Sequence, residues 1–264
     1  MKEIPVLLYQ NIGNYPESMM EDGILPETFE RQMNFLAEQG YRIVTLKQAL
    51  DHMNRQCKLP DKSLAITIDG GYRDAFTNIL PVLNKHGFQA TFFIPPESIE
   101  GERNIKEMPI KCLTWDEVHK IMQSGMEIGL LAYGARSIKD GYDEDAVKES
   151  IETDMRVMSG HIDSQIRYCA FKEGVPGESL WNFLKDQGFH GVFTQCPTYR
   201  ATGNDCIGRI QIDDDDNNIF LTKISKAYLF FKDKRSWKYI RKYKIAKLAH
   251  KISELWNFIK GEAR

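Results

Sequence analysis

One carboxylate, that of Asp69, lies at the carboxyl end of a predicted strand, a place where catalytic groups are often found. Residues 64–68 (Leu-Ala-Ile-Thr-Ile) form an apolar run that predicts a buried strand, and Asp69 follows at its carboxyl end. Gly70 and Gly71 then predict a tight turn. A carboxylate beside a pocket can act as a general base near neutral pH. The alternative is that Asp69 is a structural acceptor for backbone N–H groups of the turn.

The segment Leu64–Phe76 (LAITIDGGYRDAF) resembles the first motif of the polysaccharide deacetylase family, the NodB homology domain, which usually reads Thr-Phe-Asp-Asp-Gly. In that family the first Asp is the catalytic base and the second is a metal ligand. Gly70 stands at the second position here. Weaker matches to the family lie on both sides of this motif, in the family's order, within residues 3–212. They are at 4–13, 25–41, 89–94, 113–118 and 124–129.

The second motif is altered at both of its metal ligands. After Met-Glu-Ile-Gly the family usually continues Ser-His-Thr-x-x-His, and both histidines bind the metal. This chain continues Leu-Leu-Ala-Tyr-Gly-Ala over 130–135, so Leu131 and Ala135 stand at the histidine positions. A zinc site of this kind needs three protein ligands and an open position for water. We therefore expect no cofactor, with zinc or another divalent metal only if catalysis has been retained by another route.

The third motif, Arg-x-Pro-Tyr-Gly in the family, is best matched by residues 170–174 (Ala-Phe-Lys-Glu-Gly). The family's arginine orients the base, and Ala170 stands in its place. We therefore expect Asp69 to lack an arginine partner, which favours a structural role over that of a working base. Lys172 and Glu173 either line the opening of the pocket that Asp69 would face or form a solvated ion pair at its edge.

Glycan sites combine aromatic faces with amide and hydroxyl groups. The candidates for contacting a sugar are therefore Tyr9, Gln10, Tyr133 and Trp115, together with Lys172 and Glu173. The alternative is that the aromatic residues belong to the core and that Gln10 ends a strand. Asp69 and Tyr133 each follow a predicted strand, so both should face one cleft at the carboxyl ends of the strands.

Strand-like and helix-like runs alternate along the chain, which predicts an α/β fold. Helices are expected near 28–39, 114–123, 143–159 and 178–187, and the acidic run 213–216 is interpreted as a solvated turn rather than a calcium site. The resemblance implies an irregular (β/α) barrel over residues 1–231, with a basic amphipathic helical tail over 232–264. Strands are expected at 4–9, 42–45, 64–68, 88–94, 126–131, 166–170, 191–194 and 207–212.

Composition narrows the class of protein. Five cysteines form no C-x-x-C pair, which is typical of reduced thiols, and no signal peptide or membrane-length apolar run is evident. These features predict a cytoplasmic protein, with a peripheral position at the inner face of the membrane as a further option. The net charge of −2 combines about −10 over the body with about +8 from Lys232 onward. An acidic body does not favour nucleic acid.

The tail has an apolar seam at spacings of three and four residues, flanked by lysines, which predicts an amphipathic helix within 235–260. Such a helix can lie on an anionic membrane surface, pair with a partner protein, or pack on its own barrel. The seam consists of Ile245, Leu248, Ile252, Leu255 and Ile259.

Three functions remain open. The altered ligand positions favour a protein that has lost the metal-dependent mechanism and binds a glycan or a partner in surface-polysaccharide biosynthesis. The second is an active carbohydrate N-deacetylase with a relocated site. The third is an interaction protein acting through its basic tail. The sequence leaves the glycan and the oligomeric state open.

Overall fold

The computed structural model describes residues 4–14, 23–105, 108–132, 143–172, 174, 176–195, 206–213 and 216–225. A sheet of nine strands lies at its centre, and every pairing in that sheet is parallel. Its order is β12-β11-β10-β9-β6-β5-β1-β13, with β4 also paired to β5. The strands are β1 (Val6–Tyr9), β4 (Arg42–Ile43), β5 (Ser63–Asp69), β6 (Thr91–Ile94), β9 (Glu127–Leu131), β10 (Tyr168–Phe171), β11 (Gly191–Thr194), β12 (Cys206–Gly208) and β13 (Ile210–Gln211).

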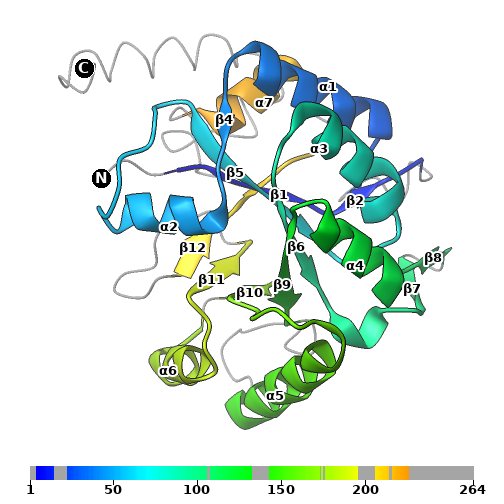
Figure 1. Ribbon diagram of the computed structural model, residues 1–264, viewed down its shortest axis with the longest axis vertical. Helices are drawn as coiled ribbons and strands as arrows, with labels where there is room; N and C mark the ends of the chain where they lie inside the picture. Colours follow the sequence, from blue (N-terminus) through cyan, green and yellow to red (C-terminus); the bar gives the residue numbers. More distant parts are fainter. Residues whose placement is uncertain are drawn as a thin grey trace.

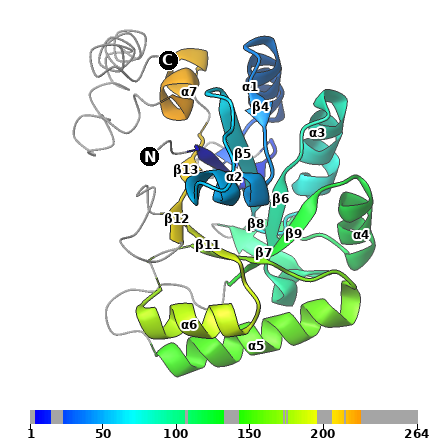
Figure 2. The same ribbon diagram turned by 60° about the vertical axis from the view of Figure 1, so that its left-hand side comes forward.

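The sheet curls into a nearly closed barrel (Figure 2). Arg209 lies at its seam, between β12 and β13. Strands β12 and β13 are the two ends of the strand order, yet only this one residue separates them in the sequence. The N–H group of Arg209 donates to the carbonyl of Thr194 on the β11 side, at 2.9 Å. On the β1 side, the N–H group of Ile212 donates to the carbonyl of Leu8, at 3.0 Å. The two edges of the sheet are thus joined through one short segment.

Helices surround the sheet, with α1, α3 and α4 along one side and α5 beside α6 at one end (Figure 1). Two small ribbons, β2 (Asn11–Ile12) with β3 (Gly23–Ile24) and β7 (Glu102–Ile105) with β8 (Met108–Lys111), complete the described part. Among the described residues, none of the helices has the length and apolar character needed to span a bilayer. The helices are α1 (Pro26–Glu38), α2 (Leu46–Met53), α3 (Leu80–His86), α4 (Trp115–Gln123), α5 (Glu144–His161), α6 (Glu178–Asp186) and α7 (Asn217–Ile224), with short turns Ala75–Ile79 (π) and Pro96–Ser98 (3₁₀).

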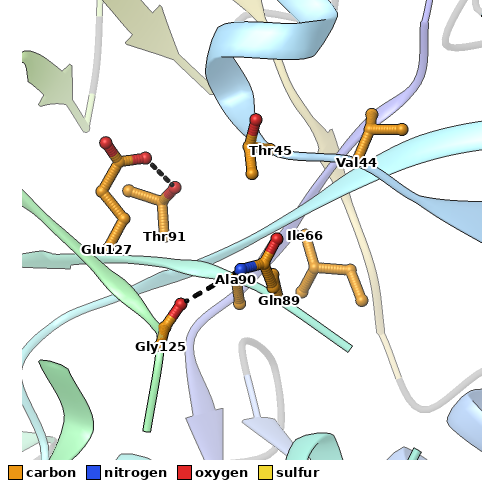
Figure 3. Close-up of a pocket in the computed structure, with 8 residues that line it drawn as sticks. All are labelled: Val44, Thr45, Ile66, Gln89, Ala90, Thr91, Gly125 and Glu127. Atoms are coloured by element: carbon orange, nitrogen blue, oxygen red, sulfur yellow. Dashed lines mark hydrogen bonds between the residues drawn. The ribbon is translucent and has the colours of Figure 1, made fainter. Parts of the chain in front are cut away.

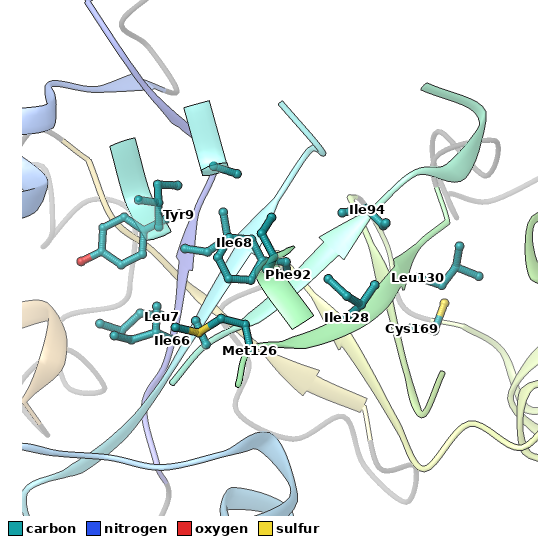
Figure 4. Packing of buried hydrophobic residues seen from close by; sticks show 14 of the residues in the cluster. Leu7, Tyr9, Ile66, Ile68, Phe92, Ile94, Met126, Ile128, Leu130 and Cys169 are labelled. Atoms are coloured by element: carbon teal, nitrogen blue, oxygen red, sulfur yellow. The ribbon is translucent and has the colours of Figure 1, made fainter. Parts of the chain in front are cut away.

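Alternation along the strands divides the buried residues into two clusters. On β5, Leu64, Ile66 and Ile68 belong to the outer cluster beneath the helices, part of which is drawn in Figure 4. Ala65 belongs to the inner cluster, which fills the barrel. The same alternation turns Thr67 and Asp69 inward. Asp69 is therefore delivered to the carboxyl end of the barrel interior by the period of the strand.

The predicted (β/α) barrel is confirmed, and all eight predicted strand regions contain strands of the sheet. Thr114 and Glu117 form a reciprocal capping box at the start of α4. Of the solvated turn predicted at 213–216, Asp216 is exposed and in addition caps α7 by accepting from two backbone N–H groups. The Asp213 carboxylate is less solvated than predicted, because it pairs with the buried Lys223 at 2.8 Å. The predicted tail, 232–264, lies outside the described residues, so the predicted division at residue 231 stays a prediction.

Candidate functional site

A small pocket lies at the carboxyl ends of the barrel strands, where sites in (β/α) barrels collect. Gln10 follows β1, Asp69 ends β5, Leu131 ends β9, and Lys172 and Gln195 follow β10 and β11. The cavity has a volume of about 30 Å³. Its lining residues are Gln10, Asp69, Gly70, Tyr72, Arg103, Leu131, Lys172 and Gln195.

Asp69 forms a bidentate ion pair with Arg209 beneath this pocket. Nη1 of Arg209 donates to Oδ1 at 2.6 Å, and Nη2 donates to Oδ2 at 2.7 Å. The arginine side chain is 0% exposed and the aspartate side chain 5% exposed. Both carboxyl oxygens accept a hydrogen bond, which is the geometry of an ionised carboxylate with a guanidinium fork.

The interior of the barrel supports the guanidinium group of Arg209. Nη1 also donates to the hydroxyl of Thr67 at 3.3 Å, and the group lies 5.2 Å from the centre of the Phe93 ring. Burial raises the pKa of the Asp69 carboxyl, while the charge and hydrogen bonds of Arg209 act in the opposite direction. The charge of Lys172 lowers the same pKa to a smaller degree. The pair is thus a buried, charge-matched unit at the seam of the barrel.

The expectation that Asp69 has no arginine partner is therefore wrong. Ala170 is buried inside the barrel and supplies no charge, but Arg209 reaches the same carboxylate from the opposite edge of the sheet. The structural alternative also needs correction, because Asp69 is bonded by a side chain rather than by the N–H groups of the turn. The N–H group of Gly70 donates instead to the carbonyl of Phe93, at 3.1 Å.

Gly70 has a backbone conformation that disfavours the family's second aspartate. Its φ is +118°, a value that L-amino acids rarely adopt. A Cβ at residue 70 would lie 2.4 Å from Cε2 of Tyr72. The tyrosine ring thus stands where the side chain of a second aspartate would begin.

The residues at the carboxyl end of the barrel do not fit the metal that the family implies. Gly70 and the buried Leu131 offer no ligand atom, and Ala135 lies outside the described residues. Within the described part of the chain, no group of three His, Cys, Asp or Glu side chains is placed to hold a metal ion. The carboxylate that remains, Asp69, is already matched by an arginine. Among the described residues, this pocket therefore lacks the ligand set that the family's metal requires.

The other predicted site residues divide into three groups. Gln10 and Lys172 line the pocket, and their contact with a sugar stays a prediction. Tyr9 does not, because alternation turns it outward, where its hydroxyl donates to Gln32 Oε1 at 3.0 Å in the core. Trp115 is also buried, and its ring stacks on that of His161 with the ring centres 4.1 Å apart. The sugar contacts predicted for Tyr9 and Trp115 are corrected accordingly. Tyr133 and Glu173 lie outside the described residues.

Sequence reasoning missed Arg209, Tyr72, Arg103 and Gln195. A signal existed for Arg209, because 207–212 was predicted as a strand and Ile207 belongs to the inner cluster. Residue 209 is then the next inward position by the period of two. No such signal marked Arg103, which reaches the pocket from the β7–β8 ribbon and whose Nη1 donates to the Gly70 carbonyl at 3.4 Å.

A second small cavity, of about 20 Å³, lies where β5, β6 and β9 begin (Figure 3). Thr91 donates to Glu127 Oε2 at 3.1 Å, and Gln89 donates to the Gly125 carbonyl at 3.4 Å. Burial raises the pKa of the Glu127 carboxyl. The amino-terminal face of such barrels serves stability rather than catalysis. The pocket around Asp69 is therefore the candidate functional site.

Comparison with known proteins agrees with the fold. The sequence profile described as polysaccharide deacetylase matches residues 56–192, and the chain belongs to that family. YxkH of Bacillus subtilis (strain 168), whose name describes it as a candidate polysaccharide deacetylase, is 30% identical over 109 residues. That alignment covers 41% of this chain and 38% of YxkH, so the chain matches well under half of the length of this relative.

Solved structures share the fold at low sequence identity. IcaB from Ammonifex degensii has a TM-score of 0.68 at 22% identity, over 80% of this chain and 92% of its own. The Streptococcus pyogenes deacetylase PplD, solved in complex with acetate, has a TM-score of 0.69 at 15% identity, over 84% and 98%. A de-N-acetylase from Aggregatibacter actinomycetemcomitans has a TM-score of 0.68 at 19% identity, over 84% and 99%. These likenesses establish the barrel.

Proposed function

We propose that this polysaccharide deacetylase-like protein binds a glycan and does not perform metal-dependent deacetylation. The observation that carries the proposal is the buried pair of Asp69 with Arg209 in a pocket whose metal-ligand positions include Gly70 and Leu131. A general base must accept a proton from water or substrate. Here both carboxyl oxygens already accept from the guanidinium group, and the side chain is 5% exposed.

For the rate of deacetylation, the loss of the metal ligands matters more than the retention of Asp69. General-base assistance alone contributes about 10²–10⁴-fold to a rate, whereas enzymes accelerate reactions by about 10⁶-fold or more. A bound metal ion would supply the missing part by activating water and polarising the carbonyl group. The described residues offer no such site.

A glycan ligand is supported by the family and by the pocket. Members of the family act on polysaccharides, and one structural neighbour is a de-N-acetylase by name. Gln10 and Gln195 bring amide groups to the pocket, and Tyr72 brings an aromatic ring. Such groups suit the hydroxyl and acetamido groups of sugars. On this reading the protein acts in surface-polysaccharide assembly by recognising a glycan.

The test measures binding and turnover on the same material. N-acetylated oligosaccharides are titrated into the full chain by calorimetry, and acetate release is followed with and without added zinc. Binding without acetate release is expected in both conditions. Zinc-dependent release that Asp69→Asn abolishes, and that Asp116→Asn on the exposed face of α4 leaves intact, would instead support an active N-deacetylase. Absence of binding would leave the basic tail as the route of interaction.

A further inference from the structure

Positive charge gathers at the pocket around Asp69. Asp69 and Arg209 cancel each other, because they form a bidentate pair. Arg103 and Lys172 add two cationic side chains to the lining. Glu97 lies close enough to Arg103 for the arginine charge to lower its pKa, although burial raises that pKa more strongly. Asp74 and Glu102 also lie near Cys112 beside Arg103. Among the described residues that line the pocket itself, Asp69 is the one carboxylate, and Arg103 and Lys172 are the cations.

The two cations are held in different ways. Arg103 is anchored to the turn after β5, because Nη1 donates to the Gly70 carbonyl and the guanidinium lies 5.4 Å from the centre of the Tyr72 ring. Lys172 follows β10 and is half-buried at the inward position after Ala170. One cation is thus fixed in place, whereas the other is a flexible ammonium that can follow a ligand.

The size of the pocket limits what can enter it. A volume of about 30 Å³ has room for about two water molecules by this measure, since each needs about 10–15 Å³. Two waters occupy about the space of the two oxygens of a carboxylate group. A whole sugar ring is too large for this space. A small charged group, carried on a ring that stays at the mouth, can enter it.

We propose that this pocket binds the carboxylate of an acidic sugar, such as a uronic acid residue, with Lys172 and Arg103 as its cationic contacts. The amide groups of Gln10 and Gln195 donate hydrogen bonds to the same group, and the sugar ring remains at the mouth. Hydrogen bonds from a cation to a carboxylate are about twice as strong as neutral ones, which gives preference over a neutral sugar. This inference rests on the proposed glycan-binding function and specifies its ligand.

The experiment compares two ligands that differ in one group. An oligosaccharide of alternating glucuronic acid and N-acetylglucosamine, and the same chain with its carboxyl groups reduced to alcohols, are titrated into the full-length protein at low and at physiological salt. The acidic chain is expected to bind about tenfold more tightly than the neutral one. Lys172→Gln should reduce that ratio to about threefold or less, and Arg103→Gln should reduce it as well.

Lys58→Gln is the matched control, because Lys58 is exposed in the loop before β5, at the opposite end of the barrel. It should leave the ratio unchanged, and thermal melting should show that all three variants fold. Equal binding of the two chains would overturn the carboxylate site while leaving the glycan-binding function standing. Failure of both chains to bind would overturn both. A preference for the acidic chain that Lys172→Gln and Arg103→Gln leave intact would place it elsewhere, for instance on the basic tail, and would overturn the assignment to this pocket.

Discussion

Arg209 and Asp69 are 140 positions apart in the sequence, yet their side chains form two hydrogen bonds of 2.6 and 2.7 Å inside the barrel. The arginine lies between β12 and β13, at the seam, and the aspartate ends β5, with β1 between β5 and β13 in the sheet. The pair therefore connects the closing segment of the barrel to β5, the strand that carries Asp69. The contact that occupies the Asp69 carboxylate thus also joins distant parts of the fold.

The first prediction concerns the stability of this pair. Arg209→Met leaves a buried carboxylate without its partner, so it should lower the free energy of unfolding by about 3–5 kcal/mol. Asp69→Leu combined with Arg209→Met should recover most of that loss, because no unpaired charge remains. Urea denaturation of the two single variants and the double variant gives the coupling energy. Lys47→Ala, which breaks an exposed pair with Asp51 on α2, is the control and should cost at most about 1 kcal/mol. A loss no larger than the control's would show that the buried pair contributes little.

The second prediction concerns Gly70 and Tyr72. Gly70→Ala should destabilise the fold by about 1–3 kcal/mol for its positive φ, and by a further ~1 kcal/mol or more for the contact with the Tyr72 ring. Gly125→Ala is the matched control, since φ is +82° there and no atom lies within 4 Å of the new Cβ. In a Tyr72→Ala background the cost of Gly70→Ala should fall to that of the control. An unchanged cost in that background would mean that the ring moves away freely.

The third prediction is that the purified protein carries far less than one zinc per chain, because Gly70 and Leu131 provide no ligands. Elemental analysis of protein prepared without chelators checks this. Gly70→Asp, Leu131→His and Ala135→His together should rebuild a site only when Tyr72→Ala is added, since the ring occupies the space for the new aspartate. Near one zinc per unaltered chain, lost on Asp69→Asn, would restore the metal-dependent mechanism.

The fourth prediction concerns pH and Asp154 on α5. Burial, and to a lesser extent the charge of Glu97, raises the pKa of this carboxyl from an ordinary value near 3.8 to about 7. Within the described structure its Oδ2 atom is buried without a hydrogen-bond partner. A folded-state pKa above the unfolded value means that the native state holds the extra proton between about pH 4 and pH 7. Stability should therefore decrease as pH rises through that window.

Asp154→Asn removes this ionisation while keeping the shape of the side chain. The variant should be more stable than the unaltered protein at pH 8, by about 1–2 kcal/mol, and similar to it at pH 5. Thermal melting from pH 5 to pH 8 compares the two, with Asp116→Asn as an exposed control. Equal slopes of stability against pH in both proteins would show that another group is responsible.

The fold was predictable from local patterns because the barrel is built from strands that each bury an apolar run. The period of two in residues 64–69 also fixes which face Asp69 occupies. The partner of Asp69 was not predictable from the family's third motif, because Ala170 replaces the expected arginine and the charge comes from the far edge of the sheet. Helix α7 was missed because Asp216, in an acidic run, is its N-cap. The contact of Arg209 with Asp69 and the N-cap of α7 both depend on where residues lie in the folded chain rather than on local composition.

The last prediction is that the segment from Lys232 onward is a detachable attachment to the barrel. The last described helix, α7, already packs on α1, with the Phe220 and Phe35 rings 6.0 Å apart. The strand order is complete by Gln211, so truncation after Phe231 removes no described element. The truncated protein should melt within a few degrees of the full chain. Collapse of the fold on truncation would show that the tail is part of the core.

The tail's function follows from its charge of about +8 and its apolar seam. Basic residues near an anionic surface contribute about 1 kcal/mol each, and salt screens that contribution over about 10 Å at 0.1 M. The full chain should therefore sediment with phosphatidylserine vesicles at low salt, less so as salt increases, and weakly with neutral phosphatidylcholine vesicles. Ile252→Ser interrupts the seam without changing the charge of the tail, so it separates insertion from simple charge attraction. If the truncated barrel sediments as well as the full chain, the tail is excluded as the membrane contact. If the full chain does not sediment with anionic vesicles, an acidic protein is favoured over a membrane as the partner of the tail.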